Sequence, residues 1–454
     1  MEYLKKKLSI GETMLKNAII KGTFILTATG FITRFIGFFF RMFLSHTFGE
    51  EQVGLYQLIF PIYALCFSLS CAGIETALSR CVAQKISRGK KREADLMLYQ
   101  ALLLSVSLSA LLGLLLRRFA TFLAIYILGD LRCEELLRTL AFALPFASVH
   151  SCICGYYLGQ KKTKIPALSQ LLEQLGRVIS IFMLYNFLEN NQSSVGIIIA
   201  VLGIVIGEFI SAMFCIRYYC ARPHTRFLLS AIYNNRKLSN ELTSLAIPLT
   251  SNRILMNILQ SVETISIPLC LQKYGYTNSE ALSTYGVLTG MALPCVFFPT
   301  AITNSVSTML LPTVAEIEAE DNLARLKQLI QKVILFGFGL GSICGVVFLL
   351  LGSVIGTYLF NSSLVGDFLR TLAWICPFMY MNNTLISILN GLGKANNSFV
   401  INICGLGIRI CGVWVGIVSF GMQGYLWGLL GSQLIVSILC IAQLKLYIEK
   451  RELF

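Results

Sequence analysis

Charged residues are scarce in this chain. Only 13% of its 454 residues are Asp, Glu, Lys or Arg, about half the share that is typical of soluble globular domains. Long apolar runs recur along nearly the whole sequence, and many reach the roughly 20 residues that cross a hydrocarbon layer about 30 Å thick. The composition therefore excludes an ordinary soluble domain, and we expect an all-α polytopic membrane protein.

Residues that bind metals or catalyse reactions are also few. The three histidines, His46, His150 and His224, are far apart, and the fifteen cysteines include no CxxC pair and no Cys/His cluster with metal-ligand spacing. We therefore expect no metal site and no cofactor, and we interpret the cysteines as small apolar helix residues. A membrane enzyme such as a glycosyltransferase would need carboxylates or a metal in a sizeable loop, whereas the loops here are short and mostly basic.

Lys and Arg outnumber Asp and Glu by 37 to 23, for a formal net charge of +14. Most of these cations lie in alternate short loops and near both ends of the chain, as the positive-inside rule expects of cytoplasmic segments. We therefore expect no nucleic-acid partner and place both termini in the cytoplasm. Twelve spans account for the apolar runs, at roughly 18–44, 53–79, 94–116, 136–159, 166–188, 195–219, 242–271, 283–311, 328–358, 365–391, 398–419 and 424–447.

The two halves of the chain resemble each other. LRTLAFALPF at 137–146 matches LRTLAWICPF at 369–378, and the same shift of 232 residues pairs glycines, prolines and arginines elsewhere. A constant shift over several spans indicates two parallel six-helix repeats. We expect an N-terminal lobe at 1–220, a cytoplasmic linker at 221–241 and a C-terminal lobe at 242–454, in a chain that acts as a monomer.

Two arginines interrupt the first apolar run, in FITRFIGFFFRMFL. Arg34 and Arg41 share a helix face with small or polar residues, and Arg34 lies about 24 Å from the cytoplasmic start of the helix. An arginine at this depth costs about 2.5–3.5 kcal/mol on insertion scales, so it usually faces protein or water. We expect Arg34 to line a hydrated cavity. Arg41 either lines the same cavity or extends to the outer interface.

Further polar residues occur within other spans. We expect Arg253, Asn257 and Gln260 to line the cavity from one face of the seventh span, together with Arg409 of the eleventh. Glu173 and Arg177 have the spacing of an intrahelical ion pair. Arg409 is the repeat partner of Arg177 but has Gly405 where Arg177 has Glu173, so we expect no local counter-ion for it. The remaining carboxylates, each a candidate for ion coupling or for an internal ion pair, are Glu75, Glu208 and Glu263.

The sign of these charges indicates the substrate. Arginines outnumber acids within the spans, and the four aspartates lie in loops or at helix ends. Guanidinium groups match phosphate oxygens and stay charged, so a cavity lined by them favours an anionic, phosphate-bearing head group. A cation exporter would be expected to carry carboxylates within the membrane instead.

The chain also resembles a known family. The segments KGTFILTATGFITRFIGFFFRMFLS, GLYQLIFPIYAL, AGIETALSR and LSQLLEQLGRV, and the long run at 247–312, are similar to the stage V sporulation protein B family. That family belongs to the lipid II and oligosaccharide flippase branch of the multidrug/oligosaccharidyl-lipid/polysaccharide superfamily. Arg34 matches a cavity arginine of related flippases within an R-x-x-G-F motif. Glu75 stands where relatives have proline or an apolar residue, and many relatives have fourteen spans.

The resemblance implies a two-lobed, MATE-like bundle with a central cavity that opens alternately to each side of the bacterial cell membrane. It implies transport of an undecaprenyl-linked peptidoglycan precursor, or a related lipid-linked glycan, for spore cortex. An Na⁺ or H⁺ gradient, or the membrane potential, is the energy source that such transport would use. The alternative function is a multidrug cation antiporter of the same fold, because a fold alone does not determine function.

Overall fold

The computed structural model describes residues 2–190, 196–221 and 236–452. Nearly all of them are helical, and no strand occurs in these three ranges. The predicted all-α polytopic class is confirmed. Most of the predicted linker lies outside the described residues, so its role as a boundary stays a prediction.

The long helices follow one another with short connections. In chain order the α-helices are α1 (Glu2–Leu58), α2 (Phe60–Phe67), α3 (Gly73–Ser87), α4 (Lys91–Arg118), α5 (Ala120–Phe122), α6 (Cys133–Leu140), α7 (Ala143–Gly159), α8 (Lys164–Asn190), α9 (Ile198–Cys220), α11 (Arg236–Tyr274), α12 (Asn278–Gly286), α13 (Leu293–Phe297), α14 (Thr300–Ala319), α15 (Leu323–Val354), α16 (Ser363–Leu372), α17 (Cys376–Gly391), α18 (Ala395–Cys411), α19 (Val418–Phe420) and α20 (Met422–Glu452). The π-helical turns are η1 (Ser68–Ala72), η2 (Leu123–Leu128), η3 (Val287–Ala292), η4 (Ile355–Leu359) and η6 (Gly412–Ile417), and η5 (Ala373–Ile375) is a 3-10 turn.

The apolar helices agree with the predicted spans. Within the described residues, nine helical segments are long and apolar enough to cross a membrane, or eleven if two bent helix pairs each count as one span. The first segment, Phe24–Ser87, has 64 residues, about 96 Å of helix, which is far more than one crossing needs. It covers the first two predicted spans. The non-helical φ of 77° at Gly49 interrupts α1 between them.

The chain divides into two compact units, and the division does not follow the midpoint of the sequence. The first unit comprises Met1–Gly37 and Ile59–Ile258, and the second comprises Phe38–Leu58 and Leu259–Phe454. Both α1 and α11 therefore contribute to each unit. That the predicted lobes are the bodies that move during transport stays a prediction.

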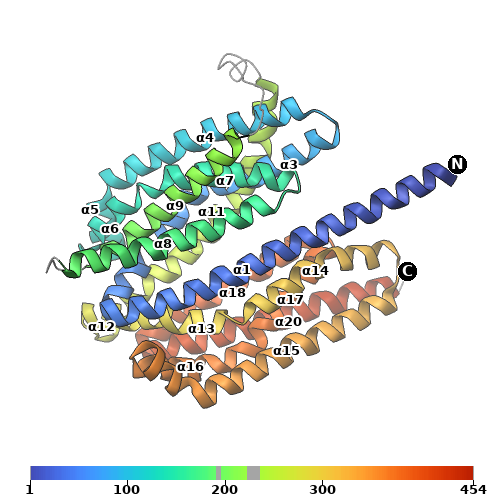
Figure 1. Cartoon of the computed structure of the whole chain (residues 1–454). Coiled ribbons are helices and arrows are strands. Elements are labelled where there is room, and N and C mark those ends of the chain that lie inside the picture. Colours follow the sequence, from blue (N-terminus) through green and yellow to red (C-terminus); the bar gives the residue numbers. More distant parts are fainter. Residues whose placement is uncertain (1, 191–195, 222–235, 453–454) are drawn as a thin grey trace. The chain divides into compact units, whose positions relative to one another are not determined.

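The first unit packs around α7. In Figure 1, α4, α7, α9 and α8 run side by side, and α7 contacts α3, α4 and α9. Its apolar core includes the fully buried Leu78, Met97 and Tyr157. Where α8 and α9 pack together, a Cβ on Gly207 would lie 2.7 Å from the carbonyl oxygen of Glu173. Glycine at this position lets the two backbones approach closely.

The second unit packs around α17, which contacts α14, α15 and α20. Gly337, Gly341 and Gly345 of α15 are spaced four residues apart and face α17 and η5. A Cβ on Gly341 would lie 2.4 Å from the Cα of Pro377. This is the small-residue pattern that allows close helix contact in a membrane, where helix association depends on packing.

The repeat seen in the sequence is also present in the backbone. The π-helical turns η2 and η4 begin at Leu123 and Ile355, 232 residues apart. Three pairs with the same separation have left-handed backbone: Gly89 (φ 74°) and Asp321 (φ 54°), Gly129 (φ 76°) and Asn361 (φ 53°), and Lys161 (φ 60°) and Gly393 (φ 72°). In the second unit, the repeat-related Gly54 and Gly286 also meet, because a Cβ on Gly286 would lie 2.6 Å from the backbone nitrogen of Gly54.

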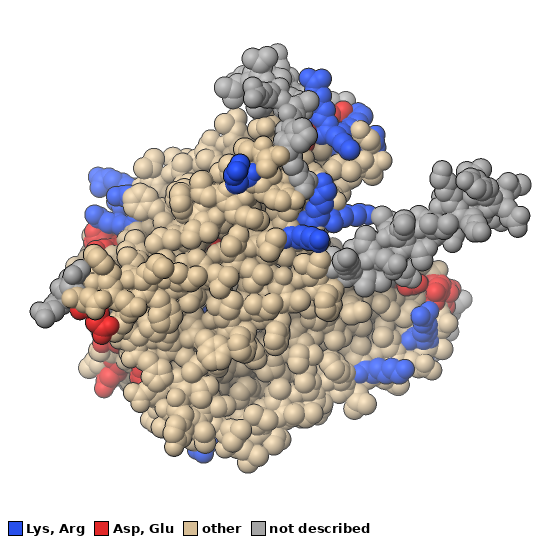
Figure 2. Space-filling model, in the orientation of Figure 1, with Lys and Arg blue, Asp and Glu red and all other residues tan. Residues whose placement is uncertain are grey.

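The surface agrees with a membrane environment. On the face shown in Figure 2 most of the area belongs to uncharged residues, and the charged groups lie mainly toward the ends of the helices. Large apolar side chains such as Leu335 and Leu350 on α15 are more than 70% exposed. Exposed apolar surface on this scale suits contact with lipid rather than water.

Candidate functional site

The first predicted cavity residue, Arg34, lies on α1 and is exposed. One turn later Gly37 faces α8, where a Cβ would lie 3.5 Å from Nε2 of Gln174. Arg41 is half-buried and belongs to the second unit, whereas Arg34 belongs to the first. The two arginines are therefore held by different parts of the fold.

The polar face of α11 packs against the second span of the first unit. Nη2 of Arg253 donates to Oγ1 of Thr76 at 3.1 Å, while the residue remains exposed. Asn257 donates its amide to the hydroxyl of Ser68. Gln260, further along the same helix, is also exposed. The guanidinium of Arg253 is thus oriented by a neutral hydroxyl.

Two carboxylates of the first unit have close polar partners. Oε2 of Glu75 accepts a hydrogen bond from Oγ of Ser151 at 2.7 Å. Glu173 forms an ion pair with Arg177, from Oε1 to Nη2 at 2.7 Å, one turn apart on α8. Each of these side chains is less than half exposed. Both carboxylates are therefore engaged inside the unit.

The counter-ion of Arg409 comes from another helix, whereas position 405, which is equivalent to Glu173 in the first repeat, is a glycine. Nε of Arg409 lies 2.7 Å from Oε1 of Glu263, which comes from α11, and the hydroxyl of Tyr425 donates to the same oxygen at 2.6 Å. Glu263 is only 1% exposed. An interhelical partner replaces the intrahelical one, and this ion pair neutralises Arg409.

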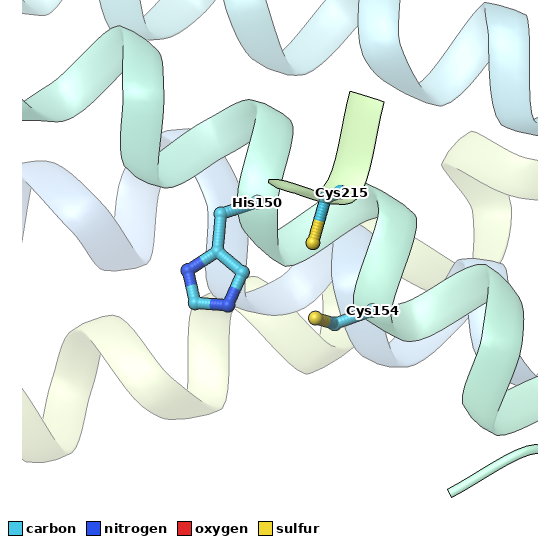
Figure 3. Close-up of side chains that lie close together, drawn as sticks. All are labelled: His150, Cys154 and Cys215. Atoms are coloured by element: carbon cyan, nitrogen blue, oxygen red, sulfur yellow. The ribbon is translucent and has the colours of Figure 1, made fainter. Parts of the chain in front are cut away.

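His150 lies in a polar cluster that joins α7, α8 and α9. Its Nδ1 is 3.3 Å from Oε2 of Glu208, and its Nε2 is 2.8 Å from Oγ of Ser169. Nearby, Cys154 lies one turn along α7 and Cys215 lies on α9 (Figure 3). The expectation that the histidines form no cluster is therefore wrong for His150. The i, i+4 spacing of His150 and Cys154 was a usable signal, but nothing in the sequence linked them to Cys215.

The two repeats differ at this cluster. The position equivalent to His150 in the second repeat is Asn382, whose amide donates to Oε1 of Gln433 at 2.9 Å. Oγ of Ser437 donates to the Asn382 side-chain oxygen at 2.7 Å. Both repeats therefore place a polar contact at the same point of the fold, but the histidine and the cysteines are specific to the first.

These contacts divide the charged groups of the spans into two classes. The carboxylates of Glu75, Glu173, Glu208 and Glu263 each have a polar or cationic partner within their own unit. The guanidiniums of Arg34 and Arg253 are exposed. The chemistry that the exposed groups offer is recognition of an anion.

Comparison with known proteins gives the family. The profile of the polysaccharide biosynthesis protein family matches residues 19–318, well over half of the chain. The chain belongs to this family. A second profile, MatE, matches residues 253–415 of the same chain.

Curated relatives come from Bacillus subtilis (strain 168). The chain is 26% identical to stage V sporulation protein B over 437 residues, which cover 94% of this chain and 83% of the relative. It is 21% identical to the lipid II flippase MurJ over 428 residues, which cover 87% and 77%. The resemblance to the stage V sporulation protein B family, predicted from its motifs, is confirmed.

Solved structures show the same fold. An inward-facing MATE family multidrug resistance transporter of the MOP superfamily aligns with a TM-score of 0.70, at 16% identity, over 93% of this chain and 95% of that one. The outward-facing conformation of such a transporter aligns with a TM-score of 0.66. This family member therefore has the MATE-like transporter fold, as predicted.

Proposed function

We propose that this protein is a flippase that moves a lipid-linked oligosaccharide across the bacterial cytoplasmic membrane by alternating access. Its substrate is an undecaprenyl-pyrophosphate-linked peptidoglycan precursor or a related glycan, used in spore cortex synthesis. Family membership and the named functions of the curated relatives support this proposal. The protein works as a monomer among membrane lipids, without a nucleic-acid partner, and both of its termini are cytoplasmic.

One observation carries the proposal. The guanidiniums of Arg34 and Arg253 are exposed, while the carboxylates of the spans are engaged by internal partners. An anionic pyrophosphate fits a pair of exposed guanidiniums, because each guanidinium can bind two of its oxygens at once. Arg34 and Arg253 hold the pyrophosphate, and Arg41, Asn257 and Gln260 complete the lining.

In this proposal Arg409 stabilises the second unit and does not contact the substrate. Its ion pair with Glu263 is buried on the carboxylate side, and loss of the arginine would leave an uncompensated buried charge in the second unit. Energy for transport comes from the membrane potential or from an Na⁺ or H⁺ gradient. In a gradient-driven cycle the carboxylates of Glu75, Glu173 and Glu208 are the groups that would exchange the ion.

The alternative is a multidrug cation antiporter. It is supported by the MatE profile match over 253–415 and by the MATE transporters of the same fold. A cationic drug would need a carboxylate without an internal partner, whereas those of the spans have partners. Efflux of a cationic dye from cells that overexpress the chain distinguishes the two functions.

The decisive experiment is rescue of cells depleted of their own lipid II flippase. The parent chain, Arg34→Ala and Arg118→Ala are expressed at equal levels in the membrane fraction. Arg118 is the matched control, because it is an exposed arginine at the end of α4, outside the proposed lining. We expect rescue by the parent and by Arg118→Ala, and none by Arg34→Ala.

The other outcomes have separate meanings. Rescue by all three proteins would support the flippase and remove Arg34 from the substrate site. Failure of a well-inserted parent chain to rescue, together with dye efflux, would replace the flippase with the antiporter.

A further inference from the structure

Three metal-ligating side chains meet inside the first unit, where neither the family nor the proposed transport requires them. His150 and Cys154 come from α7 and Cys215 comes from α9, and one ligand atom from each lies within 4.8 Å of the others. Cys154 is 6% exposed and Cys215 is fully buried. In Figure 3 both sulfur atoms lie on the same side of the imidazole ring. We propose that His150, Cys154 and Cys215 form a Zn²⁺ site that joins α7 to α9.

The spacing suits a tetrahedral ion. Zn²⁺ binds thiolate sulfur at about 2.3 Å and imidazole nitrogen at about 2.0–2.1 Å, so tetrahedral ligand atoms lie roughly 3.5–3.8 Å apart. The three donor atoms lie within 4.8 Å of one another, so each separation exceeds this range by at most about 1 Å. Ser169 offers an oxygen as the fourth ligand, since its Oγ lies 3.2 Å from Sγ of Cys154 and 2.8 Å from Nε2 of His150.

A contact with a carboxylate orients the His150 ring for metal binding. Oε2 of Glu208 lies 3.3 Å from Nδ1 of His150, on the opposite edge of the ring from the contact with Ser169. A proton held on Nδ1 by this carboxylate leaves the lone pair of Nε2 available to a metal ion. This carboxylate–histidine arrangement is the one that supports zinc ligands in other proteins.

Charge and ligand type favour Zn²⁺ over other ions. Binding releases the two thiol protons, and two thiolates balance a divalent cation, so the buried site gains no net charge. Cu⁺ also prefers sulfur, but with two thiolates it would leave a negative charge beside Glu208 and Glu173. Hard ions such as Mg²⁺ and Ca²⁺ prefer oxygen ligands.

The neighbouring oxygen-rich set is less suited to a metal. His150, Glu173 and Glu208 also approach within 4.8 Å of one another. Glu173, however, forms an ion pair with Arg177, and Glu208 contacts Nδ1 of the histidine. Both carboxylates are therefore better placed to support the site formed by His150, Cys154 and Cys215 than to form a metal site of their own.

The site lies near one end of both helices. Cys154 precedes the last residue of α7, Gly159, by five positions, and Cys215 precedes the last residue of α9, Cys220, by five, about 8 Å of helix in each case. In the proposed orientation this is the cytoplasmic end, where thiols stay reduced and available to a metal. A bound ion would cross-link the two helices and stabilise the first unit.

The test uses the full chain, purified in detergent, stripped with a chelator and kept reduced. Co²⁺ is the optical probe, and Zn²⁺ is measured by elemental analysis and by displacement of Co²⁺. The variants are Cys154→Ser and Cys215→Ser. The control is Cys152→Ser, because Cys152 is a fully buried cysteine of the same helix α7 that is outside the group of ligands.

We expect the parent and Cys152→Ser to bind about one equivalent, to show a thiolate-to-cobalt charge-transfer band, and to melt at a higher temperature with Zn²⁺. The two ligand variants should lose the band and at least tenfold in affinity. The proposal is overturned if folded parent protein gives no thiolate band, or if Cys154→Ser and Cys215→Ser bind as Cys152→Ser does. If the variants do not fold, the cobalt spectrum of the parent decides alone. Binding of Cu⁺ but not Zn²⁺ would overturn the choice of ion.

Discussion

Lys161 and Gly393, which are 232 residues apart, adopt the same left-handed backbone, with φ of 60° and 72°. Lys161 follows α7, which contains Pro145, and Gly393 follows α17, which contains the repeat-related Pro377. A left-handed conformation is unstrained for glycine but costs an ordinary L-residue roughly 1–2 kcal/mol. Both repeats therefore contain a turn whose backbone conformation favours glycine, although only the second repeat has glycine there.

Replacing Lys161 with glycine should stabilise the protein. We expect Lys161→Gly to raise the free energy of unfolding by about 1 kcal/mol, because it removes the left-handed strain. The converse substitution at the repeat-related position, Gly393→Ala, should destabilise the protein by a similar amount. Thermal unfolding in detergent measures both changes. Equal melting temperatures for the parent and Lys161→Gly would show that the turn carries no strain.

The glycine stripe on α15 gives a steric prediction with an internal control. A Cβ on Gly341 would lie 2.4 Å from the Cα of Pro377, whereas a Cβ on Gly339, two residues away, meets nothing within 4 Å. We expect Gly341→Ala to destabilise the second unit by about 1–3 kcal/mol, as overpacking does. Gly339→Ala should be neutral or slightly stabilising. Melting temperatures of the two variants would contradict this prediction if they fell equally.

The buried ion pair between Glu263 and Arg409 should respond strongly to removal of one partner. We expect Arg409→Gln to cost about 3–5 kcal/mol, because it leaves the buried carboxylate of Glu263 without its counter-ion, and Glu263→Gln to cost less, because the Arg409 side chain is 31% exposed. The double variant should cost much less than the sum of the two. A double-mutant cycle on thermal unfolding measures the coupling.

A surface pair supplies the control for that cycle. Lys445 and Glu449 are 3.7 Å apart, with side chains 76% and 50% exposed. Removing either should change stability by less than about 1 kcal/mol. A coupling between Glu263 and Arg409 no larger than that of the surface pair would mean that the observed contact contributes little to the fold.

Arg34 should act through its hydrogen-bonding geometry as well as its charge. We expect Arg34→Gln to weaken binding of a lipid-linked pyrophosphate to the purified protein by roughly 10- to 100-fold, since a hydrogen bond to a charged group contributes about 1.5–3 kcal/mol. Arg34→Lys keeps the charge but loses the guanidinium fork, so an intermediate loss is expected. Arg118→Gln is the control. Unchanged binding by Arg34→Gln would exclude a contact with the phosphates.

The features that the sequence predicted are those set by local patterns. Apolar runs predicted the spans, and the four-residue spacing of Glu173 and Arg177 allowed the ion pair that the structure contains. The left-handed backbone of Lys161 could also have been inferred, because the constant shift aligns it with Gly393.

The features that it did not predict depend on which faces of distant helices meet. The sequence left open whether Glu263 of α11 pairs with an arginine, and it did not identify Arg409 of α18 as the partner. The cluster of His150, Cys154 and Cys215 likewise needs the packing of α7 against α9. A single sequence contains no signal for such contacts, since the period of a helix determines which residues share a face but not what that face touches.

The pairing of Glu263 with Arg409 also has a consequence for the order of synthesis. The two residues are 146 positions apart in the chain, and at about 5–20 residues per second the ribosome needs roughly 7–30 s to add the arginine after the glutamate. During that interval α11 has already emerged with an acidic residue whose cation does not yet exist. The contact between α11 and α18 therefore forms only after residue 409 has been added, so the final packing of α11 follows its synthesis by at least this interval.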